Sequence, residues 1–226
     1  MTPAELLNLF RIEVDDQVEP YLWSDFEFYT YLNEAQNTFA SLIGGIADQS
    51  SKITQLNYSI GDEFLPFDER ILYVKNARDE SNNRVVVQNY NSFIGSYAED
   101  DYGNVADSDL DDGKTGTVRF LITDVEDNKF RLYPIPDHAG TLKLYTFRLP
   151  LTEITGATSE LEIASRHHIH LLSYVKYKAM SKQDVETFEL GSPQEFYQEF
   201  IQYVALAGKE KSGREDRKRT VRYGGL

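Results

Sequence analysis

Residues 23–42 combine a helix start signal with a long apolar stripe, and no other segment constrains the fold as strongly. Ser24 and Glu27 are spaced so that each side chain can accept a hydrogen bond from the backbone N–H of the other, which is a capping box. Trp23 and Phe28 occupy the positions of a hydrophobic staple. The stripe consists of Phe28, Leu32, Ala35, Phe39 and Leu42. Its spacing predicts a helix about 28 Å long whose apolar side must be buried by another part of the chain.

A shorter helix is predicted before this one. Thr2, Pro3 and Glu5 form a second start signal, because Pro is favoured at the first helical position and Glu can close a capping box. The acidic and proline-containing residues 15–20 end it, and Gly44 with its glycine neighbour ends the next helix. We therefore expect a helical hairpin at the start of the chain.

Between residues 52 and 149 the apolar pattern changes from a helical period to a period of two. Turn residues rich in Gly, Asn, Asp and Pro separate the alternating runs. The stronger runs are residues 71–77, 84–89, 117–123, 129–133 and 141–149. About six to eight short strands of this kind predict an antiparallel β-sandwich or a barrel-like module.

The helical period returns near residue 150. Residues 160–182 predict one long helix, and Ser192, Pro193 and Glu195 form the start signal of another. We expect the two helices to form an antiparallel pair that covers the stripe of residues 23–42. The expected helical core consists of Trp23, Phe28, Leu32, Phe39, Leu172, Val175, Phe196 and Phe200.

The predicted fold class is α+β, with about four helices (two N-terminal, two C-terminal) in a bundle. Residues 1–51 and 150–208 form a discontinuous helical domain, and residues 52–149 form the inserted β domain. With 226 residues, 41% of them apolar, the chain is long enough to bury a substantial core. Residues 209–226 form a separate basic C-terminal arm.

Charge is distributed unevenly along the chain. The formal net charge is −14, yet residues 209–226 hold seven basic and three acidic residues, a net charge of +4, which leaves −18 for the other 208 residues. The arm residues of interest are Lys209, Lys211, Arg214, Arg217, Lys218, Arg219, Arg222 and Tyr223. Such a segment is either a solvated tail or an arm that docks on an acidic or nucleic-acid partner. The apolar Val221, Tyr223 and Leu226 favour docking, because a solvated tail has no use for them.

Residues 99–113 carry seven acidic residues and no basic one, which favours a mobile exposed loop. The alternative is a calcium loop, because Asp107, Asp109 and Asp111 stand at every second position. That pattern is broken by Asp112, where the loop needs Gly, and by Val118, where it needs Glu. We therefore expect no metal site.

Catalytic motifs are missing from the sequence. The chain has no cysteine, which excludes disulfides and thiolate nucleophiles, and it has no nucleophile elbow or phosphate-binding loop. His167 and His170 share a helical face but lack the carboxylate of a metalloprotease motif. An acid cluster at residues 124–127 leaves a hydrolase as a weak option. We predict neither an enzyme nor a cofactor, and no apolar run is long enough to span a membrane.

The order of several segments and their short sequence motifs resemble those of the head-to-tail adaptor (gateway or connector) proteins of tailed bacteriophages. A short helix is followed by a Trp-Ser helix start, a β module, and a histidine-containing helix. The segments that carry the likeness are Trp23-Ser24, Leu32-Asn33-Glu34-Ala35-Gln36, Arg148-Leu149-Pro150, Leu171-Leu172, Tyr177-Lys178-Ala179 and Ser181-Lys182-Gln183-Asp184. The likeness covers most of the chain.

The resemblance implies a structural virion protein that forms a homo-oligomeric ring of about twelve copies at the head-tail interface, assembled in the host cytoplasm. Its partners would be the portal protein, a tail or nozzle protein, and genomic DNA that passes without sequence-specific binding; no membrane is involved. The resemblance also implies that the arm binds the portal. Asn33, Glu34 and Gln36 become candidates for contacts with a neighbouring subunit or with the DNA channel.

Two other classes of function stay open at this point. A carbohydrate-binding or other β-sandwich interaction module should align exposed aromatic residues, such as Tyr90, Tyr97 and Tyr102, on one face. A hydrolase would use the acids Asp124, Glu126 and Asp127 in a pocket.

Overall fold

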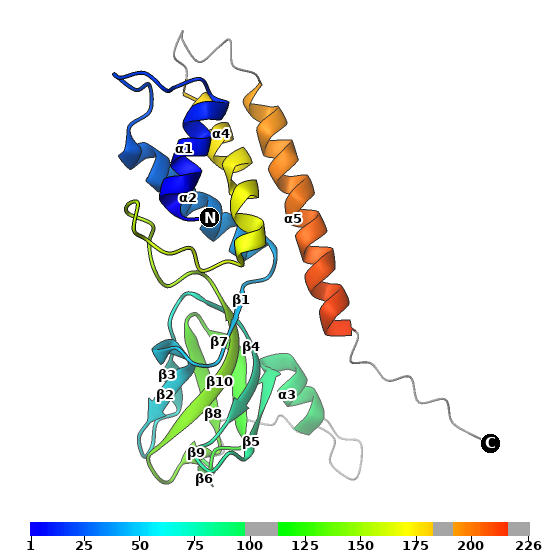
Figure 1. Cartoon of the computed structure of the whole chain (residues 1–226). Coiled ribbons are helices and arrows are strands. Elements are labelled where there is room, and N and C mark those ends of the chain that lie inside the picture. Colours follow the sequence, from blue (N-terminus) through cyan, green and yellow to red (C-terminus); the bar gives the residue numbers. More distant parts are fainter. Residues whose placement is uncertain (98–112, 183–191, 217–226) are drawn as a thin grey trace, which may run out of the picture. The chain divides into compact units, whose positions relative to one another are not determined.

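The computed structural model describes residues 1–97, 113–182 and 192–216 (Figure 1). The chain divides into two compact units, Met1–Ile46 together with Leu149–Leu226, and Ala47–Arg148. The first unit is helical and the second is built on a curled β-sheet. This mixture of helices and sheet confirms the predicted combination of helical and β segments.

Both N-terminal start signals form the predicted caps. In the helical unit, Thr2 caps α1 and Ser24 caps α2, and each capping box is closed by Glu5 or Glu27. The α-helices of this unit are α1 (Pro3–Glu13), α2 (Asp25–Leu42), α4 (Leu171–Met180) and α5 (Pro193–Asp216), with the 3₁₀ helix η2 (Ser165–His170) before α4. The predicted start of α5 is also present, since Glu195 N–H donates to Ser192 O at 3.0 Å.

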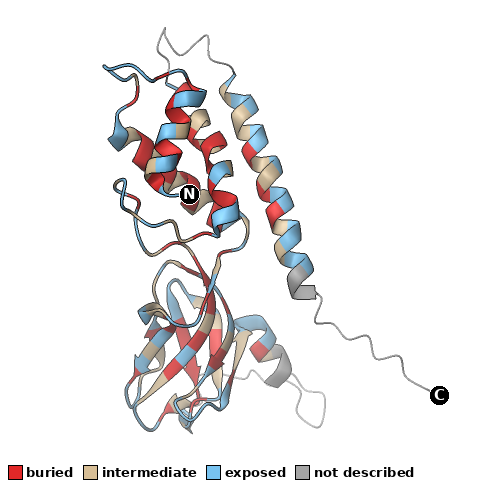
Figure 2. Cartoon of the chain, in the orientation of Figure 1, coloured by how far each residue is buried: buried red, intermediate tan, exposed pale blue. Residues whose placement is uncertain are grey.

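The stripe of α2 is buried in the helical core from Phe28 to Phe39, where α4 packs against both α2 and α5, but its last member, Leu42, is 52% exposed. Trp23 is 2% exposed, and its indole N–H donates to Ala179 O at 3.3 Å. The rings of Trp23 and Phe28 both contact Phe10 of α1, with centroids 5.6 and 5.3 Å apart. Of the expected core residues, Trp23, Phe28, Leu32, Phe39, Leu172, Val175 and Phe200 are buried and Phe196 is partly buried (Figure 2).

The prediction of one helix over residues 160–182 is wrong at its start. The segment before Ser165 is not helical, and Glu162 in it is engaged in other hydrogen bonds. Its carboxylate accepts from the backbone N–H groups of Leu151 and Thr152 at 2.7 Å, and its own N–H donates to Gln36 Oε1 at 2.8 Å. Local side-chain bonds of this kind compete with helix formation.

The β unit holds one main sheet of eight strands among the described residues, in the order β1-β10-β4-β5-β7-β8-β3, with β2 also paired to β10. Its strands are β1 (Ile46–Asp48), β2 (Gln55–Tyr58), β3 (Phe64–Pro66), β4 (Ile71–Arg78), β5 (Arg84–Asn89), β7 (Phe120–Glu126), β8 (Lys129–Tyr133) and β10 (Gly140–Arg148). The remaining elements are η1 (Lys52–Thr54), α3 (Tyr90–Tyr97), and the short strands β6 (Thr115–Gly116) and β9 (Ile135–Pro136).

The prediction of an antiparallel sheet is wrong for β5 and β7, which pair in parallel from Val86↔Phe120 to Asn89↔Thr123. Parallel neighbours require a long crossover connection. Here residues 90–119 supply it, beginning with α3. Because that helix starts directly where β5 ends, the alternating pattern of β5 gave no indication of it.

A buried ion pair joins the two ends of the β unit. Asp48 lies near its start and Arg148 at its end, and Arg148 Nε donates to Asp48 Oδ2 at 2.5 Å. Burial acts to raise the pKa of Asp48, but hydrogen bonds from Ser51, Ser50 and Arg148 outweigh it and hold this pKa well below its usual range. The pair therefore fixes the place where the chain enters and leaves the sheet.

Candidate functional site

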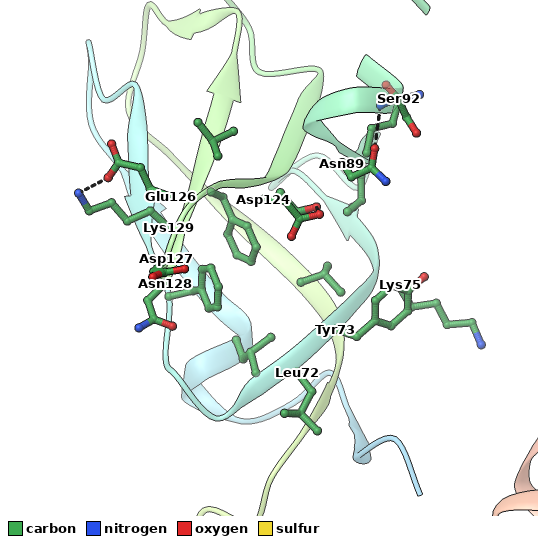
Figure 3. Close-up of a pocket in the computed structure, with 18 residues that line it drawn as sticks. Leu72, Tyr73, Lys75, Asn89, Ser92, Asp124, Glu126, Asp127, Asn128 and Lys129 are labelled. Atoms are coloured by element: carbon green, nitrogen blue, oxygen red, sulfur yellow. Dashed lines mark hydrogen bonds and ion pairs between the residues drawn. The ribbon is translucent and has the colours of Figure 1, made fainter. Parts of the chain in front are cut away.

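The β unit contains an open pocket of about 1000 Å³ on the curled sheet (Figure 3). Its lining comes from β4, β5, β7, the turn after β7 and the start of β8, together with Phe67 after β3 and Ser92 of α3. Most of the lining residues are 71–75 of β4, 87–89 of β5, and 123–130 of β7, β8 and the turn between them. We refer to this pocket as the slot.

The slot lies where the hairpin of β4 and β5 opens. These strands pair only at Ala77↔Val85 and Arg78↔Arg84. Beyond that point β5 pairs with β7 on its other side, and β4 pairs with β10. All five consecutive residues 71–75 line the slot, whereas a pocket over one sheet face would be lined by alternate residues. The slot therefore faces the edge of β4.

The lining of the slot mixes apolar and polar side chains, and one of its polar atoms has no hydrogen bond among the described residues. Phe67 and Phe130 stack with their ring centroids 4.1 Å apart, and Val74 is 4% exposed. Gln88 Oε1 is buried and accepts no hydrogen bond from the residues that the structure describes. A buried acceptor in this state costs free energy until a donor reaches it.

The rim of the slot is acidic and irregular. The pairing of β7 with β8 shifts between Ile122↔Arg131 and Glu126↔Lys129, and within this bulge Asp124 has a positive φ of 64°. Figure 3 shows the Asp124 side chain close to the middle of the lining residues. Asp124 accepts a hydrogen bond from its neighbour Thr123 at 3.2 Å.

The rim holds both acidic and basic side chains. Glu126 pairs with Lys129 at 2.6 Å, whereas Asp124 and Asp127 form no ion pair within the described ranges. The other lysine of the lining, Lys75, lies 5.6 Å from the Tyr145 and Phe147 rings of β10. The lining therefore combines three carboxylates, one of them paired, with two lysines. These are the acids considered for a hydrolase, and their place in a pocket is a tertiary feature that no sequence motif indicated.

The subunit-contact candidates of α2 make contacts within their own chain. Asn33 Oδ1 accepts from Ile154 N–H at 3.0 Å, and Gln36 is fully buried where it accepts from Glu162 N–H. Glu34 pairs with Lys178 at 2.8 Å, with 41% of its side chain exposed. Of the three, Glu34 offers the most accessible side chain to a neighbour.

The predicted arm begins inside α5, since this helix continues to Asp216. Lys209 is exposed on it, and Lys211 Nζ donates to the carbonyl oxygens of Ile43, Gly44 and Gly45 at 3.0, 3.1 and 2.7 Å. Lys211 thus binds the turn that ends α2. Arg214 lies in the last turn of α5, and the other arm residues, Arg217, Lys218, Arg219, Arg222 and Tyr223, lie outside the described residues.

The histidines of η2 hold α5 in place. His167 Nδ1 lies 2.8 Å from Tyr203 Oη, and the His170 ring stacks on Tyr203 with centroids 3.4 Å apart. Burial lowers the pKa of both histidines and raises that of Tyr203. The three-residue spacing of His167 and His170 therefore places both rings against Tyr203, where they pack η2 on α5.

Other predicted sites fall largely outside the described part of the chain. Asp107, Asp109 and Asp111 lie there, and the described residues contain no group of three potential metal ligands. Tyr90 and Tyr97 lie at the two ends of α3 and not on one sheet face, and Tyr102 is outside the description. No described helix is both long and apolar enough to cross a membrane.

Comparison with known proteins identifies a family. A search of curated proteins finds no similar sequence. The sequence profile of the SU10 adaptor protein family matches residues 1–224, which is almost the entire chain of 226 residues. The resemblance noted from the sequence is thereby confirmed, and the chain belongs to the SU10 adaptor protein family of bacteriophage structural adaptors.

Proposed function

We propose that this protein forms a ring at the head-to-tail interface of a phage particle, docks beneath the portal, and provides the attachment site for the tail. The observation that carries the proposal is the family match over residues 1–224. Because the family is one of structural adaptors, membership favours a structural role over a catalytic one. A ring is the closed form that repeated head-to-tail contacts between identical subunits produce.

The charge of the protein suits a channel through which DNA moves. The net charge of −14 repels phosphates, and tight DNA binding would need clustered Lys and Arg side chains instead. Genomic DNA would therefore pass along the ring without sequence-specific binding. The last 18 residues hold 7 of the 23 basic residues, a much higher density than in the rest of the chain.

The helical unit presents apolar residues that suit contacts with partners. Ile12, Val18 and Phe26 are 58%, 80% and 77% exposed. The loop that carries Val18 has a fixed shape, because buried Arg11 pairs with buried Asp16 at 3.0 Å. Large apolar side chains on an ordered loop and on helix termini are typical of surfaces that become buried on assembly.

The candidate portal contact is the basic segment beyond Asp216. Lys211 is engaged with the end of α2, so an arm that reaches a portal without disturbing the helical unit would begin near Arg217. Residues 217–226 contain four basic residues and no acidic one. A segment of this kind can dock by ordering on its partner.

The experiment that tests the adaptor role is native mass spectrometry of the protein mixed with its portal protein. Each subunit adds 26.0 kDa, so a ring of twelve would add about 312 kDa. No added mass on the portal oligomer would contradict the proposal. Deletion of residues 217–226 should abolish binding, and retained binding would reject the arm as portal contact while leaving the adaptor role intact.

A further inference from the structure

We draw no further inference here: the strongest candidate, the slot where the β4–β5 hairpin opens in the β unit, is lined by acidic, basic and apolar side chains together, and nothing in the structure shows what covers it.

Discussion

Replacement of Lys211 by Met should destabilise the helical unit, although this lysine belongs to the segment that composition alone assigns to an arm. In the structure its ammonium group donates to three carbonyl oxygens, those of Ile43, Gly44 and Gly45, where α2 ends. Met preserves most of the aliphatic stem and removes the charge and the donors. The change therefore isolates the contact with the turn after α2.

The expected loss follows from these contacts. A hydrogen bond to a charged group contributes about 1.5–3 kcal/mol when shielded, and a cation near a helix C-terminus adds about 0.3–1 kcal/mol. Lys211 is only half-buried, so water replaces part of what the substitution removes. We expect the free energy of unfolding to fall by about 1–2 kcal/mol. With a urea dependence of about 2 kcal/mol/M, the midpoint falls by about 0.5–1 M.

The assay is urea unfolding followed by the fluorescence of Trp23. This residue is the single tryptophan of the chain and is 2% exposed in the helical core, so it reports on the unit that Lys211 stabilises. Lys209→Met, an identical change at an exposed position of the same helix, is the control and should match wild type. Equal midpoints for the two variants would refute the reasoning.

Three further predictions concern other polar contacts. Asp48→Asn should lower the free energy of unfolding by about 3 kcal/mol at pH 7, because it removes the carboxylate that buried Arg148 binds. Since folding lowers the pKa of Asp48, the wild-type protein should lose this contribution to the free energy of unfolding as the pH falls below about 4. The difference in melting temperature between wild type and Asp48→Asn, measured by circular dichroism, should shrink over that range. Asn33→Ala should lower the free energy of unfolding, measured by tryptophan fluorescence, by about 1 kcal/mol because the hydrogen bond to Ile154 is lost. An unchanged urea midpoint would mean that Asn33 is available for contact with a neighbouring subunit. Burial lowers the pKa of His167, so the neutral histidine contributes fully to the free energy of unfolding above about pH 6.5, and this contribution is lost as the pH falls through the lowered pKa. The urea midpoint of the wild type should therefore drop from pH 7 to pH 5, and His167→Gln should reduce that drop.

Helix beginnings could be predicted because their signals are local. Thr2, Ser24 and Ser192 precede helices that start where the capping patterns place them, and the caps depend on residues three positions apart. The start of α4 could not be predicted in this way. The 3₁₀ helix η2 precedes it, and Glu162 in the non-helical segment before η2 binds Gln36, 126 positions away.

Strand positions were also accessible from the sequence, but strand neighbours were not. The runs at residues 84–89 and 129–133 coincide with β5 and β8, since alternation fixes which residues can form a half-buried strand. The parallel pairing of β5 with β7 depends on the crossover between them. The opening of the β4–β5 hairpin, and with it the slot, follows from that pairing, because β5 turns to β7 after Val85.

The sequence by itself determined the capped helix after Trp23, the insertion of a β region between helical segments, and the likeness to phage adaptors, because each depends on neighbouring residues or on segment order. Only the tertiary structure decided which polar residues are already engaged. Gln36 and Lys211 have the composition of contact residues, yet both hold distant parts of their own chain. A buried polar group takes whichever partner the fold brings near, and that partner cannot be found from spacing.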